Sequence, residues 1–404
     1  MTKLTKSWKS NFFALLVAET LAIMGFAISM PVVPLFLIED IGIEDPVKLK
    51  LWVGLIQSSA AIALAVLAPI WGHLADIYSR RMMLLRAMFG GAVVVSLISL
   101  VQSPWQLLIL RTVQGCLTGT VAAATVLTAG ITPAARIAFA LGLLQTGIAT
   151  GNTIGPLVGG VLSDFLGHRA AFLCTGLVLA LAGFIVFKGV QDDKRAAGTY
   201  KGGRRRIMPD VKPILASPTL ITLLIVSFSI QAANTIAEPM LPLFLRSLAE
   251  KARYIGSSTG IVLGAGAASA ALAAVLVGRY ATGLGYWKTL IFCLSAGAIL
   301  TLPQTFVSNV IQLTVFRAMA SFFVGGAIPV LNALLAANTD KDHQGSVYGF
   351  NSSVASAGGA LGPVIGSAIA MASYRAVFLG TALLLGLSAA GTLRRRQRLK
   401  QAET

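Results

Sequence analysis

The chain has 404 residues, of which 56% are hydrophobic and only 12% are charged, and its mean hydropathy is +0.80. This composition excludes an ordinary soluble globular protein. The formal net charge of +17 would suggest nucleic-acid binding in a soluble protein. In a membrane protein, however, basic residues gather on one side of the bilayer, so we expect a lipid-embedded chain with no nucleic-acid partner.

Apolar stretches of the roughly 20 residues that a helix needs to cross a bilayer occur about twelve times. The sequence therefore predicts an all-α membrane protein with spans near 11–38, 51–75, 82–102, 105–129, 138–165, 168–190, 217–246, 255–280, 286–306, 309–337, 344–371 and 374–393. The long polar stretch at 191–216 separates six spans from six. We expect an N-terminal half at 1–190, a cytoplasmic linker at 191–216 and a C-terminal half at 217–404 with a basic tail.

The distribution of basic residues predicts the orientation. Most of the 32 lysine and arginine residues lie on one side of the bilayer if the N-terminus is cytoplasmic, in the N-terminal tail, the 76–86 region, the linker and the tail from Arg394. Such an excess marks the cytoplasmic side. We therefore expect a monomeric, multi-pass protein of a bacterial inner membrane with both termini in the cytoplasm.

Glycines follow a regular pattern in the fifth predicted span, GLLQTGIATGNTIGPLVGG. They are Gly142, Gly151, Gly155, Gly159 and Gly160, with Pro156 directly after the third. Glycines four apart leave a strip of bare backbone on which another helix can pack closely, and the proline adds a kink. We expect this strip at the interface between the two halves.

The same glycine spacing returns near the C-terminus, at Gly349, Gly358, Gly362, Pro363 and Gly366. Other segments repeat at a near-constant distance along the chain. PVVPLFL at 31–37 returns as PMLPLFL at 239–245, and Gln106-Leu107 with Arg111 returns as Gln312-Leu313 with Arg317. The chain therefore consists of two homologous six-helix halves in parallel orientation, a repeat typical of secondary transporters.

Three ordered motifs carry a family resemblance. The segment 72–81, GHLADIYSRR, resembles the loop between helices two and three of the major facilitator superfamily, and 110–115, LRTVQG, resembles its fourth-helix signature. The segment 142–160 is similar to the fifth-helix signature of the twelve-helix drug:proton antiporters. In the loop, Ser79 stands where glycine is usual and Ile77 where a basic residue is common.

The resemblance implies proton-coupled efflux of small amphipathic or cationic compounds by alternating access, without a cofactor. The alternative is an exporter of one specific metabolite, such as a sugar or siderophore. The sequence has no GxxxxGK[ST] loop, and it shows no spaced cluster of His, Asp, Ser or Cys that would indicate an enzyme or a metal site.

The loop residues Gly72, Asp76, Arg80 and Arg81 have two possible roles. By resemblance they form a conformational latch, in which Asp76 meets a helix N-terminus or an arginine and holds the halves closed on the inside. The alternative is an ordinary interfacial acid with snorkelling arginines.

Arg111 lies within an apolar span, where a charge costs at least about 2.5–3.5 kcal/mol on insertion scales. The resemblance implies a part in proton coupling. The alternative is a structural arginine satisfied by carbonyls and by Gln114 or another polar neighbour. Arg317 occupies the equivalent place in the second half, so one of the two arginines could be merely inherited.

Glu19 and Glu238 are the acids that fall well inside predicted spans. A proton-driven exporter needs a buried carboxylate that is neutral in one state and ionised in the other. Both acids are therefore candidate proton carriers, and an acid there would also attract cationic substrates. The alternative for Glu19 is a snorkelling acid near the inner surface.

Further polar residues lie in the helices that line the cavity of the superfamily. Some are expected to touch substrate and others to form hydrogen bonds between helices. The candidates are Gln57, Gln145, Asn152, Gln231, Asn234 and Asn332.

Overall fold

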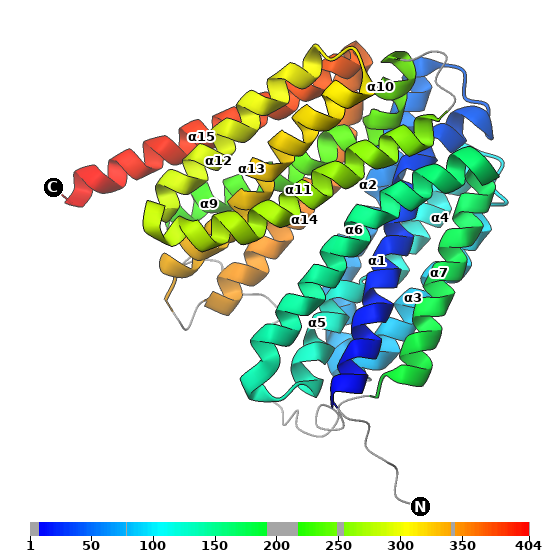
Figure 1. The fold of residues 1–404 in the computed structure, drawn as a ribbon, viewed down its shortest axis with the longest axis horizontal. Coiled ribbons are helices and arrows are strands. Elements are labelled where there is room, and N and C mark those ends of the chain that lie inside the picture. The colour runs from blue at the N-terminus through cyan, green and yellow to red at the C-terminus, as the bar shows by residue number, and fades with distance from the viewer. Residues whose placement is uncertain (1–7, 78, 192–216, 249–253, 341–343, 404) are drawn as a thin grey trace, which may run out of the picture. The chain divides into compact units, whose positions relative to one another are not determined.

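The computed structural model describes residues 8–77, 79–191, 217–248, 254–340 and 344–403, which are helical almost throughout (Figure 1). Within these residues, twelve helical stretches are long and apolar enough to cross a membrane. This finding confirms the predicted all-α membrane fold. The linker predicted at 191–216 lies, apart from its first residue, outside the described residues.

The chain forms two compact units. Unit 1 comprises Met1–Ile43 and Ser59–Arg204, and unit 2 comprises Glu44–Ser58 and Arg205–Thr404. The first turns of α2 (Pro46–Ile77) therefore group with unit 2, although the sequence assigns the whole of that span to the N-terminal half.

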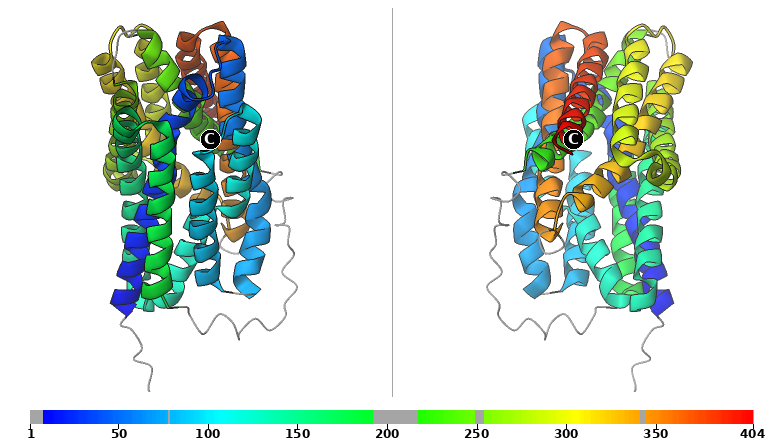
Figure 2. Two further views of the ribbon diagram at one scale, coloured as in Figure 1. Left: turned by 90° about the vertical axis from the view of Figure 1, so that its right-hand side faces the viewer. Right: turned by 90° about the vertical axis from the view of Figure 1, so that its left-hand side faces the viewer.

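Unit 1 is organised around α1 (Trp8–Glu39), which packs along α6 (Ile137–Leu166) and α7 (His168–Gly189) (Figures 1 and 2). The 3₁₀ turn η1 (Ala134–Arg136) leads into α6. The remaining helices of this unit are α3 (Arg80–Ile98), α4 (Pro104–Leu117), α5 (Thr120–Ile131) and the part of α2 that begins at Ser59.

The glycine strip of α6 packs against α1. A Cβ on Gly155 would lie 2.5 Å from the Cβ of Ala27, and one on Gly151 would lie 2.8 Å from the carbonyl oxygen of Thr20. Gly159 faces the backbone of Ile28 in the same way. The expected position of the strip between the halves is therefore wrong for these glycines, because α1 belongs to the same unit.

Unit 2 repeats this arrangement with α9 (Pro218–Ala237) in the place of α1 and α14 (Gln344–Ala372) in the place of α6. Gly358, Gly362 and Gly366 face the α9 and η2 segment at Phe228, Thr235 and Ile236. The other elements of this unit are η2 (Glu238–Met240), α10 (Leu241–Leu248), α11 (Ile255–Leu284), α12 (Tyr286–Thr301), η3 (Leu302–Thr305), α13 (Val310–Ala337) and α15 (Tyr374–Glu403).

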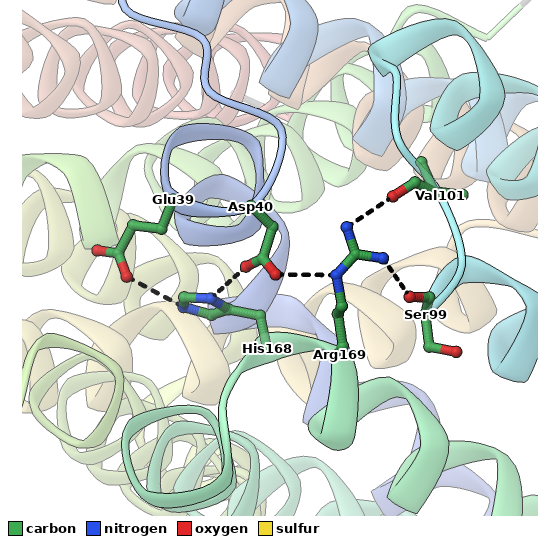
Figure 3. A network of polar contacts seen from close by, with 6 residues as sticks. All are labelled: Glu39, Asp40, Ser99, Val101, His168 and Arg169. Atoms are coloured by element: carbon green, nitrogen blue, oxygen red, sulfur yellow. Dashed lines mark hydrogen bonds and ion pairs between the residues drawn. The ribbon is translucent and has the colours of Figure 1, made fainter.

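A polar network holds one end of unit 1 together (Figure 3). Arg169, at the start of α7, donates hydrogen bonds to Asp40 (3.1 Å) and to the carbonyl oxygens of Ser99 (2.6 Å) and Val101 (3.0 Å). The neighbouring His168 places Nδ1 2.7 Å from the other carboxylate oxygen of Asp40. One guanidinium thus links the end of α1, the start of α7 and the α3–α4 connection, and it satisfies carbonyls that a helix end leaves free.

We expect Gly155→Leu to destabilise unit 1 and to impair transport, because no space exists for a side chain between α6 and α1. Overpacking at such a site costs about 1–3 kcal/mol. Thermal unfolding of the purified protein in detergent measures the effect. Gly142→Leu is the matched control. Gly142 lies in the same helix, and a Cβ on it would have no neighbouring atom within 4 Å. Equal unfolding midpoints for the two variants would contradict this packing.

Candidate transport site

Gln106 and Gln312 cap the starts of the two helices that carry the buried arginines Arg111 and Arg317. At α4, Ser103 accepts a hydrogen bond from the backbone N–H of Gln106, and the Gln106 side chain accepts one from the N–H of Gln102 at 2.9 Å. At α13, Asn309 and Gln312 make the same exchange, with Gln312 accepting from Ser308 at 3.0 Å. This reciprocal capping satisfies N–H groups at the helix start.

The caps also fix how far along its helix each arginine lies. Arg111 and Arg317 each follow their capping glutamine by the same number of residues, so the two helices carry them to equivalent positions. Both side chains are buried, with exposed fractions of 5% and 8%.

Arg111 contacts Gln114 of the same helix, with 3.2 Å between Nη1 and Oε1. Its Nε and Nη2 atoms have no hydrogen-bond partner among the described residues. The contact with Gln114 agrees with the structural alternative, but it uses only one of the guanidinium nitrogens. The other two remain available to a group that binds beside this helix.

Glu19 is fully buried, at 0% exposure, so it does not reach the surface as a snorkelling acid would. The hydroxyl of Thr120 donates a 2.8 Å hydrogen bond to its Oε1, while Oε2 has no partner among the described residues. The structure therefore joins Glu19 to Thr120, and it joins Arg111 to Gln114 instead of to the acid. Thr120 is absent from the set of site residues that the sequence suggests.

The seventh span is interrupted at Glu238, where α9 ends and a 3₁₀ turn begins. The sequence predicts one helix at 217–246, whereas the structure has α9, the 3₁₀ turn η2 and α10. The prolines Pro239 and Pro242 do not explain this alone, because their equivalents Pro31 and Pro34 lie inside the continuous helix α1. Glu238 is partly buried at η2 and interacts electrostatically with Arg317 of α13. Arg317 also donates to the carbonyl oxygen of Asn234 at 3.5 Å.

A small cavity lies beside Arg317. It has a volume of about 20 Å³ and is lined by residues that include Asn234, Ser321 and Thr381. A space of this size and polarity accommodates one water molecule. Arg317 therefore has an acid within electrostatic range and a backbone acceptor, whereas Arg111 has Gln114.

The other polar candidates fall into two groups. Gln145 and Asn152 are exposed on α6, on a side not covered by α1. Every exposed residue of α6 from Gly142 to Asn152 is glycine or polar. The exposed residues of α14 from Val347 to Ser356 follow the same rule: Tyr348, Gly349, Ser352, Ser353 and Ser356. The second group is only partly buried: Gln57, Gln231, Asn234 and Asn332.

For two of the latch residues, Gly72 and Asp76, the side chains lie outside the described part of the structure. Arg80 donates to the carbonyl oxygen of Val126 (3.4 Å), and Arg81 donates to that of Phe187 (2.6 Å). Both acceptors lie near the C-terminal ends of helices, where a cation is favourable. Ser79, where glycine is usual, caps α3 by accepting a hydrogen bond from the N–H of Met82.

Twelve candidate spans in two units, with a carboxylate and an arginine inside the spans of each, define a multi-pass membrane transporter. The family model of the Major Facilitator Superfamily matches residues 15–303 and again residues 247–404. The chain belongs to the Major Facilitator Superfamily and is a transporter, not an enzyme. This result confirms the resemblance noted in the sequence.

Curated relatives cover almost the whole chain. It is 33% identical to "Multidrug resistance protein MdtG" of Enterobacter lignolyticus, over 96% of this chain and 92% of that protein. It is 32% identical to the protein of the same name in Escherichia coli, over 97% and 96%.

Solved structures with low sequence identity share the fold. A crystal structure of the nucleoside transporter NupG matches with a TM-score of 0.77 at 12% identity, over 95% of this chain and 98% of that one. A bacterial homologue of the human lysosomal transporter Spinster, inward-facing and unoccupied, matches with a TM-score of 0.78 at 15% identity, over 98% of both chains.

We expect Glu238→Gln and Arg317→Gln to be energetically coupled, because removing one partner of a buried charge pair leaves the other uncompensated. The double variant should be less destabilised than the sum of the single variants, by about 0.5–3 kcal/mol. Free energies of unfolding in detergent measure this coupling.

The matched control is the cycle of Glu19→Gln with Arg111→Gln in unit 1. There the two side chains have separate partners, so the effects should add within about 0.5 kcal/mol. Coupling of the same size in both cycles would contradict the assigned pairing.

Proposed function

We propose that this protein exports small amphipathic or cationic compounds in exchange for protons, by alternating access. The observation that carries the proposal is a carboxylate inside an apolar span of each unit, Glu19 in α1 and Glu238 at η2. Intramembrane acids are expensive and serve proton relays or cation binding in most transporters. The name shared by the curated relatives, a multidrug resistance protein, supports a broad range of substrates.

The exposed faces of α6 and α14 support a polar pathway. A surface turned to lipid carries apolar side chains, whereas the stretches 142–152 of α6 and 347–356 of α14 expose glycine and polar residues, with the aromatic Tyr348 the one large hydrophobic side chain among them. We assign Gln145 and Asn152, with the partly buried Gln57, Gln231, Asn234 and Asn332, to the lining of the substrate path. Their amides can bind varied compounds without selecting one charge.

In the cycle that we propose, the outward-open protein takes up a proton on Glu238 or Glu19, and the bound compound leaves. The protonated protein returns inward, releases the proton and binds the next compound. Arg317 favours the ionised form of Glu238 at the inward stage, Arg111 takes part in the coupling from α4, and the loop with Gly72, Asp76, Arg80 and Arg81 holds the inner side closed between turns. A ligand shifts such an equilibrium only through a difference in affinity between the two states.

The proposal also includes the membrane, the oligomeric state and the orientation of the protein. We place it in a bacterial inner membrane as a monomer with both termini in the cytoplasm, as the basic residues of the tails and linker favour. The two halves, 1–190 and 217–404, rock about the central site, and the linker at 191–216 joins them on the cytoplasmic side.

We expect efflux of ethidium from proteoliposomes to follow an imposed pH gradient in the wild type. Glu238→Gln, Glu19→Gln or both should lose this dependence, because a glutamine cannot carry the proton. Dye fluorescence and an internal pH indicator, read together, measure substrate and proton movement.

Glu44→Gln is the control variant, because it makes the same chemical change at an exposed loop acid. The control should behave as the wild type. A wild type that ignores the gradient, but moves one sugar or siderophore, would replace drug antiport with export of a specific metabolite.

A further inference from the structure

The fourth span of unit 1 is interrupted in the middle. α4 ends at Leu117, Thr118 is extended, and Gly119 has a φ of +118°, in the left-handed region that favours glycine. α5 then starts at Thr120. A helix that begins within an apolar span presents its first free N–H groups, and the positive end of its dipole, to the protein interior.

The repeat shows that glycine alone does not cause this break. By the spacing that relates Arg111 to Arg317, Gly119 corresponds to Gly325, which lies inside the continuous helix α13. By the spacing of the repeated proline motif, Glu19 corresponds to Ser227 of α9. The break therefore occurs in the unit that has an acid at this place, and the helix is continuous in the unit that has a serine.

The acid and the break are in direct contact. Thr120 is the first residue of α5, and its hydroxyl donates to Oε1 of Glu19 at 2.8 Å. Both side chains are buried, and Oε2 of Glu19 has no partner among the described residues. One carboxylate oxygen is therefore fixed by the start of α5, and the other is free to bind a proton.

No charged side chain competes for Glu19 on the helices packed against α1. α5 contains no ionisable residue, and the one acid of α6, Asp164, lies near its far end. On α7, Lys188 adjoins Gly189, which faces Ala14, and His168, Arg169 and Cys174 lie toward the opposite end. The hydroxyl of Thr120 and the start of α5 are thus the groups that stabilise a negative charge on Glu19.

We propose that Thr120 is a positioning residue for proton exchange at Glu19, and that the break between α4 and α5 presents it to the acid. Thr120 sets the pH at which Glu19 gains and loses its proton, and it directs that proton to Oε2. This inference rests on the proposed proton-coupled function and adds to it a residue and a backbone feature that act through Glu19.

The test uses the full-length protein in proteoliposomes and two pH titrations. The first is the pH dependence of ethidium efflux. The second is the infrared carbonyl band of protonated Glu19, identified as the band that disappears in Glu19→Gln. Thr120→Val keeps the shape of the side chain and removes the donor. Its midpoint should move to higher pH by about one unit in both titrations, the size of a hydrogen bond to a charged group.

Two further variants separate positioning from packing. Thr120→Ser keeps a hydroxyl and should keep the wild-type midpoint. Thr125→Val makes the same change on the same helix, where the hydroxyl donates to the carbonyl of Val121, and should also keep it. If Thr120→Val does not fold, Thr120→Ala removes the same donor with less strain on the packing.

An unchanged midpoint in the folded Thr120 variant overturns the inference, as does a lower rate at every pH without a shift. The infrared titration separates this failure from a failure of the proposed function. If a Glu19 band titrates but Thr120→Val does not move it, only the role of Thr120 falls. If no band depends on Glu19, its role as proton carrier falls too.

Discussion

The constraint on which this structure depends is that a polar group buried in an apolar span must find its partner inside the protein. Lipid offers none, and an unsatisfied group costs several kcal/mol. The two intramembrane acids meet this requirement at places where the helix is interrupted. Glu19 binds the first residue of α5, and Glu238 stands in the turn between α9 and α10 near Arg317. Two of the helix interruptions therefore lie beside an intramembrane acid.

The duplication conserves the framework and varies the chemistry. Reciprocal caps at Gln106 and Gln312 start equivalent helices, and these helices carry Arg111 and Arg317 to equivalent places. The partners then differ, because Arg317 has an acid within electrostatic range whereas Arg111 has Gln114. In unit 2 the acid and the arginine lie within electrostatic range of each other, whereas in unit 1 each has a separate hydrogen-bond partner. Two acids in different surroundings can take and release a proton under different conditions, which one duplicated site could not do.

Much of the architecture could be predicted from the sequence. Span length, hydropathy and the repeat gave the twelve helices, and the burial of Glu19 and Arg111 follows from their place in apolar runs. The break at Thr118–Gly119 could not be predicted, because the equivalent Gly325 stays helical. The residue after the break, Thr120, contacts Glu19 from a helix about 100 residues earlier in the chain, and a sequence pattern does not show such a tertiary contact. The electrostatic interaction of Glu238 with Arg317 likewise joins segments far apart in the chain, so a sequence pattern does not show it.

The position of the glycine strips corrects the sequence interpretation in a way that bears on transport. The stretch 142–152 of α6 carries both glycines and polar residues, and a sequence pattern alone does not say which of them meet another helix. The structure buries the glycines against α1 and leaves Gln145 and Asn152 exposed. In unit 2, α14 does the same against α9. Close backbone contact without intervening side chains favours movement of each helix pair as one body in the proposed cycle. Because Glu19 belongs to α1 and the polar face to α6, the proposed proton carrier and the proposed path would then keep their mutual geometry.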